Sequence, residues 1–315
     1  MRTRLGVIGL GAMGTRVLTV AANHIDFEVR RASDLSAAAI DRLAPAHPGI
    51  LFSTNGMELA EAADLDAVYI ATPPASHERF TLAALSSGKA VFCEKPLAVD
   101  LAEGRRMRDA AERGGLATAV NFALSDQGSV TEVERALSAG EVGSVRGVDI
   151  RLHFPRWPRA FQADARWLDE REQGGFVREV LSHFVYLTDR VLGPLRPVHA
   201  SLDHAPGASE VAARGLLRAG EVPVHVSGRA GAAGGELYEW VLWGTRRSYL
   251  LRDWSELFVS EGEDWRPVEL ADSSGSQAKR LSLFAAAIRG ERGPGLADFA
   301  AALRVQEVIE AFHQP

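Results

Sequence analysis

The stretch Leu5-Gly6-Val7-Ile8-Gly9-Leu10-Gly11-Ala12-Met13-Gly14 decides the fold of this chain. Its first four residues are a short apolar run that predicts a strand, and the residues after Gly14 have the composition of a helix. Glycines spaced Gly-x-Gly-x-x-Gly between a strand and a helix are typical of a turn that binds a dinucleotide. The first permits the tight turn, the second lets the backbone approach the pyrophosphate, and the third lets helix and strand pack closely. We therefore expect the residues from the first to the last glycine to hold the cofactor: Gly9, Gly11, Ala12, Met13 and Gly14.

An acidic residue stands where a ribose partner is expected. A second strand opens at Phe27-Glu28-Val29 and ends near Asp34, twenty residues after the last glycine. That is the usual distance for a carboxylate that accepts hydrogen bonds from the ribose hydroxyls and repels a 2′-phosphate. The pattern favours NAD as the cofactor. NADP is the alternative cofactor, because Arg30 and Arg31 lie close to Asp34 in the sequence. The side chains of these two arginines could also face away from the cofactor.

Lys95 is unusual, because almost every basic residue of this chain is an arginine. It is one of three lysines among 35 basic residues, which leaves 32 arginines (35 − 3). An ammonium can lose its proton in a suitable environment, whereas a guanidinium stays charged. Lys95 follows the strand-like run Ala90-Val91-Phe92-Cys93 and precedes a proline, within Glu94-Lys95-Pro96. We interpret it as a candidate for proton chemistry.

Composition narrows the class of protein. With 315 residues, 46% hydrophobic and 24% charged, the chain is long enough for two domains of a soluble globular enzyme. Its net charge of −6 argues against nucleic acid as a partner. The single cysteine, Cys93, excludes an internal disulfide, fits a reducing compartment and is expected in the core. No stretch is long enough to cross a membrane, so we expect a cytoplasmic protein. The histidines show no metal-ligand spacing, and we expect no metal.

Up to about residue 121, apolar strand-like runs alternate with helix-like segments, which predicts a parallel sheet covered on both faces. Ligands of such sheets bind at the carboxyl ends of the strands. The glycine turn, Asp34, Thr72-Pro73-Pro74 and Glu94-Lys95-Pro96 all follow apolar runs. We therefore expect the four motifs to share one edge of the sheet.

The pattern changes after residue 121. One clear helix is predicted over Phe176 to Leu192, and five strand-like stretches follow from Val198 to Leu251 without helices between them. This succession predicts an antiparallel sheet, closed by a final pair of helices. The expected organisation is an α/β chain with a dinucleotide-binding domain at residues 1–120 and an α+β substrate-binding and oligomerisation domain at residues 121–315.

Together these residues resemble the glucose-fructose oxidoreductase/inositol dehydrogenase (Gfo/Idh/MocA) family of NAD(P)-dependent oxidoreductases. The likeness covers nearly the whole chain. Its marks are the glycine turn, Ala71-Thr72-Pro73-Pro74 with His77, Cys93-Glu94-Lys95-Pro96-Leu97, and Gly174-Gly175 ahead of a helix that bears His183. The resemblance implies a Rossmann domain paired with an open, mainly antiparallel sheet, and association as a homodimer or homotetramer. It also implies a set of residues that line or position the cofactor: Thr72, Pro73, Pro74, His77, Glu94 and Lys95.

The family usually presents an Asp and, four residues later, a His on the helix after the double glycine. Glu179 and His183 occupy these positions here, and their spacing places both on one helix face. A further Asp that is common in the family is replaced by Tyr186, and Arg178 and Ser182 also differ from polyol dehydrogenases. These departures weaken any transfer of substrate identity.

Hydride transfer from a secondary alcohol requires a base for the hydroxyl proton. The resemblance implies that Lys95, His183 and Glu179 form the catalytic set, and the sequence does not divide the acid/base role between Lys95 and His183. The leading hypothesis is a dehydrogenase or reductase of a sugar, an inositol or a related polyol. Reduction of an imine or conjugated substrate, and a non-catalytic dinucleotide-binding regulator, are the alternatives. Of the six tryptophans, Trp157 and Trp167 are candidates for stacking on a sugar, and the rest are expected in sheet faces or interfaces.

Overall fold

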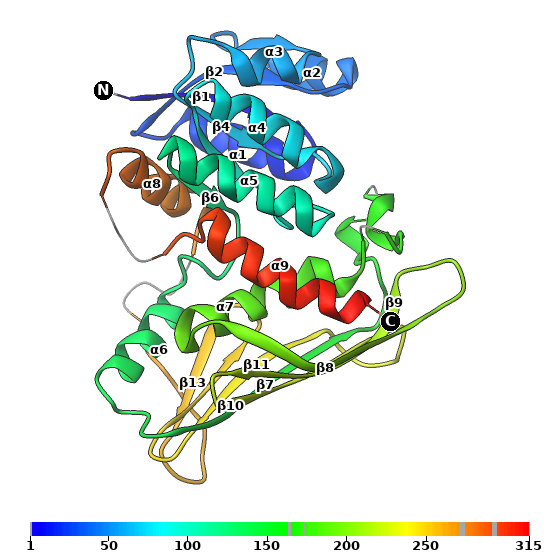
Figure 1. Cartoon of the computed structure of the whole chain (residues 1–315), viewed down its shortest axis with the longest axis vertical. Coiled ribbons are helices and arrows are strands. Elements are labelled where there is room, and N and C mark those ends of the chain that lie inside the picture. The colour runs from blue at the N-terminus through cyan, green and yellow to red at the C-terminus, as the bar shows by residue number, and fades with distance from the viewer. Residues whose placement is uncertain (1, 163–164, 173, 271–274, 292–294, 315) are drawn as a thin grey trace. The chain divides into compact units, whose positions relative to one another are not determined.

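The computed structural model describes residues 2–162, 165–172, 174–270, 275–291 and 295–314, and it contains two compact units (Figure 1). Unit 1 comprises Met1–Phe122 and Ser276–Leu303, and unit 2 comprises Ala123–Gly275 and Arg304–Pro315. The structure thus groups a late segment of the chain with the first unit. The functional division at residue 120 stays a prediction.

Unit 1 is built on a six-stranded sheet, sheet A, in the order β3-β2-β1-β4-β5-β6. All five strand pairs are parallel, as expected from the apolar runs. The strands are β1 (Thr3–Ile8), β2 (Phe27–Ser33), β3 (Leu51–Ser53), β4 (Ala67–Ile70), β5 (Ala90–Cys93) and β6 (Thr118–Val120). The strand order reverses between β1 and β4, which is the switch point at which parallel sheets of this kind bind ligands.

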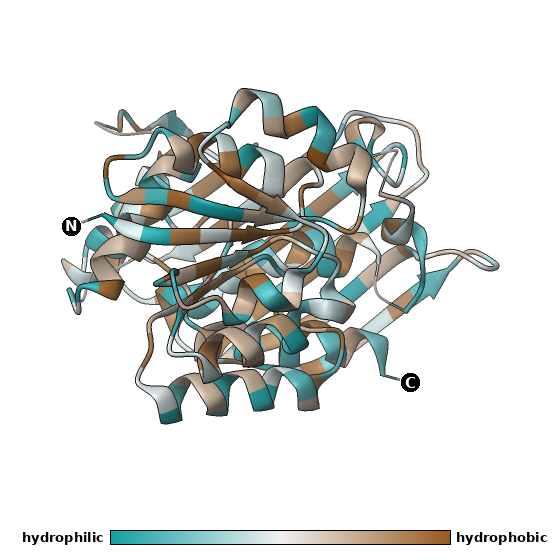
Figure 2. Ribbon diagram, turned by 90° about the horizontal axis from the view of Figure 1, so that it is seen from above, coloured by the Kyte–Doolittle hydropathy of each residue, from teal (hydrophilic) through white to brown (hydrophobic). Residues whose placement is uncertain are grey.

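Helices cover sheet A. They are α1 (Ala12–Ala22), α2 (Ala37–Leu43), α3 (Gly56–Glu61), α4 (His77–Ser86), α5 (Leu101–Gly114) and α8 (Gln277–Ile288), with short 3-10 turns at Ala44–Ala46 and Pro74–Ser76. Helix α4 packs against α3 and α5, and α1 packs against α8. In Figure 2, hydrophobic and hydrophilic bands alternate along the helices, as expected of helices with one buried side.

Helix α8 comes from the far end of the sequence and completes the core of unit 1. Phe284 of α8 lies with its ring centroid 6.4 Å from that of Phe27 on β2 and 5.1 Å from that of Phe92 on β5. All three rings are fully buried. Aromatic packing of this kind buries large apolar surfaces, so the first 122 residues depend on α8 for part of their core.

Unit 2 is built on an eight-stranded sheet, sheet B, in the order β14-β13-β12-β11-β7-β10-β9-β8. Its strands are β7 (Val145–Phe154), β8 (Leu195–His204), β9 (Glu210–Ala219), β10 (Val222–Ala230), β11 (Leu237–Gly244), β12 (Ser248–Arg252), β13 (Glu256–Ser260) and β14 (Arg266–Pro267). The sheet is mainly antiparallel, as expected. The central β7–β10 pair is parallel, however, and the sequence did not predict β13 or β14.

The helices of unit 2 are α6 (Gly128–Ser138) and α7 (Ser182–Leu192), and α9 (Phe299–His313) runs from unit 1 into unit 2. Short 3-10 turns occupy Ala160–Gln162 and Arg166–Asp169. Two strand glycines make room for aromatic rings. A Cβ at Gly228 would lie 2.5 Å from Phe176, and one at Gly215 would lie 2.6 Å from Phe312. Small residues at these positions therefore let helices approach sheet B closely.

The predicted single helix over residues 176–192 was wrong in one respect. Residues Val177–Leu181 form a π-helix, and the α-helix begins only at Ser182. A π segment inside a helix often marks a functional site, because it re-aims the side chains of one turn. Glu179 lies in the π segment, whereas His183 lies in the first turn of α7.

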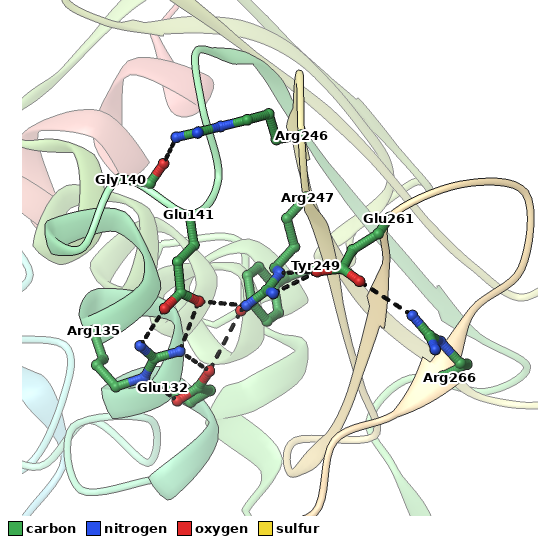
Figure 3. Close-up of polar contacts among 9 residues, drawn as sticks. All are labelled: Glu132, Arg135, Gly140, Glu141, Arg246, Arg247, Tyr249, Glu261 and Arg266. Atoms are coloured by element: carbon green, nitrogen blue, oxygen red, sulfur yellow. Dashed lines mark hydrogen bonds and ion pairs between the residues drawn. The ribbon is translucent and has the colours of Figure 1, made fainter.

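An ionic cluster ties α6 to the strands of sheet B (Figure 3). Arg135 of α6 contacts Glu132 at 2.8 Å and Glu141 at 2.6 Å. Arg247, just before β12, contacts both Glu141 and Glu261. Hydrogen bonds from Arg135 lower the pKa of Glu132. Single surface ion pairs contribute little, but a shared network of this size fixes the position of α6 along the sheet.

Among the described residues, none of the helices is long and apolar enough to span a lipid bilayer. The same residues contain no cluster of three His, Cys, Asp or Glu side chains able to hold a metal ion.

His313, near the end of α9, should make the stability of the protein depend on pH. Burial, the largest effect, and the charges of Arg178 and His204 lower the pKa of His313 from 6.5 to about 3. The unfolded chain therefore binds a proton below pH 6.5 that the folded protein rejects. We expect the free energy of unfolding to fall as the pH drops below that value, by at most about 1.4 kcal/mol per pH unit from this group.

Urea unfolding between pH 7 and pH 4 measures this slope. His313→Gln should flatten it, whereas His225→Gln, which changes an exposed histidine on β10, should leave it unchanged. Equal slopes for all three proteins would contradict the assignment to His313.

Candidate functional site

The structure explains in different ways why glycine stands at each of the three positions of the first turn. Gly9 has a φ of +93°, and a Cβ there would lie 2.6 Å from the carbonyl oxygen of Ala71. A Cβ at Gly14 would lie 1.8 Å from the carbonyl oxygen of Gly9. A Cβ at Gly11 would meet nothing within 4 Å. The fold therefore requires Gly9 and Gly14, whereas the space beside Gly11 is available to a ligand.

Helix α1 begins at this space. Gly11 is its N-cap residue and provides no side chain to cap the first N–H groups. Gly11 and Ala12 are exposed, and the Met13 side chain is 37% exposed. A helix N-terminus that is uncapped and accessible suits a pyrophosphate, which accepts hydrogen bonds from the N–H groups and is favoured by the helix dipole. These residues fit a dinucleotide.

Asp34 follows β2 directly, and its carboxylate is hydrogen-bonded to the backbone of the glycine turn. Its Oδ2 accepts a hydrogen bond from the Leu10 N–H at 2.6 Å, and its Oδ1 accepts one from the Ser36 N–H at 2.8 Å. A carboxylate oxygen can accept more than one hydrogen bond, so Asp34 keeps acceptor capacity for a ribose hydroxyl.

The two arginines near Asp34 make ion pairs elsewhere. Arg30 contacts Glu28 at 3.0 Å, and Arg31 contacts Asp64 at 2.9 Å. Each cation therefore already has a carboxylate partner, so neither is dedicated to a 2′-phosphate. The preference for NAD over NADP stays a prediction.

His77 links the Thr72-Pro73-Pro74 loop to the Glu94-Lys95-Pro96 loop. Its Nε2 lies 2.8 Å from the carbonyl oxygen of Thr72, and its Nδ1 lies 3.0 Å from that of Pro96. Burial lowers the pKa of His77, although the carbonyl oxygens oppose this effect. The buried ring thus holds together two of the predicted motifs. Contact of His77, Pro73 or Pro74 with the cofactor stays a prediction.

Glu94 is anchored by two side chains, one on β4 and one directly after β6. Its Oε1 accepts hydrogen bonds from the Tyr69 hydroxyl at 2.5 Å and from the Asn121 amide at 2.8 Å. Burial and the nearby Glu94 raise the pKa of Tyr69 well above its usual value of 10, so Tyr69 stays a donor. The half-buried Lys95 follows Glu94 directly. Glu94 therefore positions the backbone that carries Lys95.

Cys93 ends β5 and is fully buried, as expected for a core residue. Burial raises the pKa of its thiol well above the usual value. The thiol therefore stays protonated at neutral pH.

In unit 2, the carboxylate of Glu179 lies beside two polar side chains of the Phe154-to-Trp167 segment. Glu179 accepts a hydrogen bond from Gln162 at 3.0 Å and lies 3.6 Å from the guanidinium of Arg159. Arg159 also donates to Gln162 at 2.8 Å. This group of donors and acceptors, the Arg159–Gln162–Glu179 cluster, suits the recognition of hydroxyl groups.

His183 is buried on α7, with 6% of its surface exposed. Its Nδ1 accepts a hydrogen bond from the backbone N–H of Ala123 at 3.1 Å. The indole ring of Trp254 packs against the imidazole with its centroid at 5.3 Å and an interplanar angle of 80°. Trp254 was expected in a sheet face or an interface, and its contact with His183 makes it part of the candidate site.

Other residues near Glu179 are structural. Arg178 makes a buried, bidentate ion pair with Glu310 of α9, with both distances at 2.8 Å. Ser182 donates to the carbonyl oxygen of Arg178 at 2.7 Å. Tyr186 is only 4% exposed, and burial raises its pKa. Arg178, Ser182 and Tyr186 are therefore buried side chains of unit 2.

The two tryptophans proposed for sugar stacking have other structural contacts. Trp157 packs edge-on against Phe154 and Phe176, and its indole N–H donates to the carbonyl oxygen of Leu168 at 3.1 Å. Trp167 lies in a 3-10 turn. Stacking of either ring on a sugar stays a prediction.

Six residues of the site were missed by sequence reasoning: Tyr69, Asn121, Ala123, Arg159, Gln162 and Trp254. Asn121 could have been predicted as a site residue, because it follows the last strand of sheet A at the edge where the other motifs lie. Tyr69 sits inside a buried strand, Ala123 acts through its backbone, and Trp254 lies in a turn before a strand that was not predicted. Their side-chain types gave no indication of these contacts.

The architecture of unit 1 is that of an NAD-binding Rossmann fold. The chain belongs to the GFO/IDH/MocA oxidoreductase family: the model described as "Oxidoreductase family, NAD-binding Rossmann fold" matches residues 3–122, and the family's C-terminal domain matches residues 130–250. The resemblance seen in the sequence is thereby confirmed.

Curated relatives match only part of the chain. An inositol 2-dehydrogenase from Klebsiella pneumoniae (strain 342) is 34% identical over 154 residues, which are 46% of this chain and 44% of the relative. An inositol 2-dehydrogenase from Agrobacterium fabrum is 35% identical over 163 residues, or 49% and 44% of the two chains. The chain thus matches less than half the length of these relatives.

Solved structures share the fold over the whole chain. A 3-ketoreductase from Actinomadura kijaniata, solved with NADP and TDP-benzene, has a TM-score of 0.84 at 21% identity, covering 99% of this chain and 97% of its own. The two-domain fold, with a Rossmann sheet and a mainly antiparallel sheet, is thereby confirmed.

Proposed function

We propose that this protein is an NAD(P)-dependent oxidoreductase that acts on a secondary alcohol or ketone of a sugar, an inositol or a related polyhydroxylated ring. The observation that carries the proposal is the arrangement at the edge of sheet A. There His77 joins the Thr72 loop to the Lys95 loop, beside a glycine turn with room for a pyrophosphate. The partial match to inositol 2-dehydrogenases supports a cyclic polyol as the substrate.

When bound, the nicotinamide cofactor supplies the carbon that accepts or donates the hydride. Gly11, Ala12, Met13 and Asp34 would hold it. The chain's own residues handle the substrate oxygen. We assign Lys95 and His183 to proton transfer and to stabilisation of the charge that develops on that oxygen.

The Arg159–Gln162–Glu179 cluster supports a polyhydroxylated substrate. It offers a carboxylate acceptor next to amide and guanidinium donors, a combination that can bind adjacent hydroxyl groups in a fixed orientation. Correct orientation of the ring relative to the reacting carbon contributes to the rate as well as to specificity. Association into a homodimer or homotetramer stays a prediction.

The proposed function is tested by following nicotinamide absorbance with NAD and NADP separately. The substrates are inositols, hexoses, sugar acids and keto-sugars, with cyclic imines as the alternative class. Turnover of at least one polyol or keto-sugar supports the proposal. Turnover of imines alone would favour the alternative reductase, and cofactor binding without turnover of either class would favour a regulator.

Asp34 should determine the preference between the two cofactors. Asp34→Ala removes a charge-assisted hydrogen bond to the ribose, worth about 1.5–3 kcal/mol, and also removes the repulsion of a 2′-phosphate. We expect the Kd for NAD to rise about 10- to 100-fold while that for NADP falls or stays the same. Calorimetric titration with each cofactor measures both values.

Asp41→Ala is the control, because Asp41 is an exposed acid on α2 of the same unit. Its Kd values should match those of the wild type. Because Asp34 also accepts the Leu10 N–H, the melting temperature of each variant should be recorded beside the titrations. An unchanged NAD-to-NADP ratio in a folded Asp34→Ala would contradict the assignment.

A further inference from the structure

The π segment Val177–Leu181 has a hydrogen-bond pattern in which a side chain replaces a backbone donor. The N–H of Ser182 donates to the carbonyl oxygen of Val177, five residues earlier. In an α-helix this N–H would donate to Arg178, four residues earlier. The carbonyl oxygen of Arg178 instead accepts the hydroxyl of the buried Ser182 at 2.7 Å. The hydroxyl thus satisfies the carbonyl oxygen that the π segment has separated from its backbone donor.

A carboxylate from β9 holds the N–H of the same valine. Glu210 is buried, and its Oε1 accepts a hydrogen bond from the Val177 N–H at 2.6 Å. The carboxylate fills the space beside Gly175, where a Cβ would lie 2.0 Å from Oε2. A carboxylate that accepts a backbone N–H at the start of a helix stabilises that end of the helix. Val177 is therefore held at its N–H by Glu210 and at its carbonyl oxygen by Ser182.

The π segment determines the direction of Glu179 relative to His183. In an unbroken α-helix, residues four apart share a face, as expected of this pair from the sequence. One inserted residue rotates the side chains before it by roughly 100° relative to those after it. Glu179 lies within the π segment, whereas His183 lies beyond it, in α7. Rewinding the segment into an α-helix would therefore turn Glu179 away from its present partners without displacing His183.

The partners of Glu179 are held in place by contacts of their own. Arg159 donates to Gln162 at 2.8 Å and to the Tyr238 hydroxyl at 3.3 Å. Its guanidinium lies 4.7 Å from the centroid of the Phe161 ring, and only 10% of its side chain is exposed. The rest of unit 2 thus fixes the guanidinium and the amide. The direction of Glu179 decides whether its carboxylate reaches them.

We infer that the Ser182 hydroxyl and the Glu210 carboxylate hold residues 177–181 in the π conformation and thereby direct Glu179 into the polar cluster that binds the substrate hydroxyls. Ser182 and Glu210 are then positioning residues, which determine substrate specificity through Glu179. The inference rests on the proposed function for the polyhydroxylated substrate of this cluster. The conformation of the helix does not depend on the identity of the substrate.

Crystal structures of two Ser182 variants test the role of the hydroxyl without any turnover. Ser182→Ala removes the donor to the Arg178 carbonyl oxygen, and an α-helical turn would give that oxygen a backbone donor again. We expect residues 177–181 to rewind into an α-helix in this variant. Ser182→Thr keeps a hydroxyl that can bond to the same carbonyl oxygen, and it should keep the π segment. A π segment that survives in Ser182→Ala would overturn the role of the hydroxyl.

Steady-state kinetics with the polyol that the wild type turns over test the substrate role. Ser182→Ala should raise the KM for this polyol about 10- to 100-fold, because the hydroxyl groups lose a hydrogen bond to a charged side chain. Its kcat should stay within about threefold, and the Kd for NAD should not change, since His183 and unit 1 keep their structure. Ser182→Thr should restore the wild-type KM. A rewound Ser182→Ala with an unchanged KM would show that the π segment does not position Glu179.

Two Glu210 variants test the second anchor in the same assays. The side-chain amide oxygen of Glu210→Gln can still accept the Val177 N–H, so the KM should stay within about threefold of the wild type. Glu210→Ala leaves that N–H without its acceptor and should raise the KM as Ser182→Ala does. Equal KM values in the two Glu210 variants would remove Glu210 from the inference.

Thr131→Ala is the matched control, because it removes a hydroxyl bond to the Gln127 carbonyl oxygen at 3.4 Å within the α-helix α6. It should change neither the π segment nor the KM. If the wild type turns over no polyol or keto-sugar, the proposed function fails, and the substrate role of Ser182 and Glu210 fails with it. The crystal structures of the Ser182 variants then still decide whether the hydroxyl holds the π segment.

Discussion

Lys95→Met is expected to lower kcat about 10³-fold, within the range of 10²- to 10⁴-fold for loss of a proton-transfer group. Methionine keeps much of the length of the lysine side chain and removes the amine. The Glu94 anchor and the His77 contacts involve other atoms and should survive. We therefore expect the Kd for NAD to change by no more than about threefold, so that chemistry is lost and binding is kept.

Lys89→Met is the matched control for this variant. Lys89 precedes the same strand, β5, at its amino end, and its amine donates to the carbonyl oxygen of Ser87 at 3.3 Å. The same change there should leave kcat and the cofactor Kd at their wild-type values. A Lys95→Met variant that turns over substrate within tenfold of the wild type would remove Lys95 from the catalytic set. Loss of cofactor binding in that variant would instead make Lys95 a binding residue.

The parts of unit 1 that depend on local sequence were predictable. Strands β4 and β5 of sheet A are short, fully buried apolar runs, and a parallel sheet buried on both faces produces that signature. Strands β2 and β5 begin and end within a residue of the positions expected. The packing of α8 on sheet A was not predictable, because the local sequence of a helix does not indicate which of two sheets the helix packs against.

Unit 2 was harder to predict for physical reasons. A π-helix differs from an α-helix by one inserted residue, so the apolar pattern of Val177 to Leu192 fits both. Strand β13 follows Asp253 and Trp254, which both have positive φ, and a tryptophan does not predict that backbone conformation. The parallel β7–β10 pair joins strands far apart in sequence, a partnership that strand propensities do not encode.

The candidate site likewise contains some residues that could be predicted from the sequence and others that could not. Motifs whose chemistry depends on residue type and spacing, such as the glycine turn and the lysine after β5, were found from sequence. Ala123 was not, because its contribution is a backbone N–H that any residue except proline would offer. Trp254 was not found either, because it lies in a turn with a positive φ, a backbone conformation that a bulky residue disfavours.

The glycines of the turn should separate stability from cofactor binding. A Cβ at Gly14 would lie 1.8 Å from the Gly9 oxygen and 2.7 Å from the Gly9 carbonyl carbon. Backbone atoms cannot move aside as a flexible side chain can, so Gly14→Ala should cost at least about 3 kcal/mol, at the upper end of overpacking effects. We expect little folded protein at 37 °C, measured by circular dichroism and urea unfolding.

Gly11→Ala should have the opposite result. Its Cβ meets no protein atom within 4 Å, and its φ of −67° is open to alanine, so the melting temperature should stay close to that of the wild type. The new methyl group would occupy the space where a pyrophosphate approaches the backbone, and the Kd for NAD should rise at least about tenfold. Gly49→Ala, whose Cβ also meets nothing within 4 Å, controls for the substitution itself. If Gly11→Ala bound NAD as tightly as Gly49→Ala, the cofactor would not approach unit 1 at this turn, and the placement of the dinucleotide on α1 would be wrong.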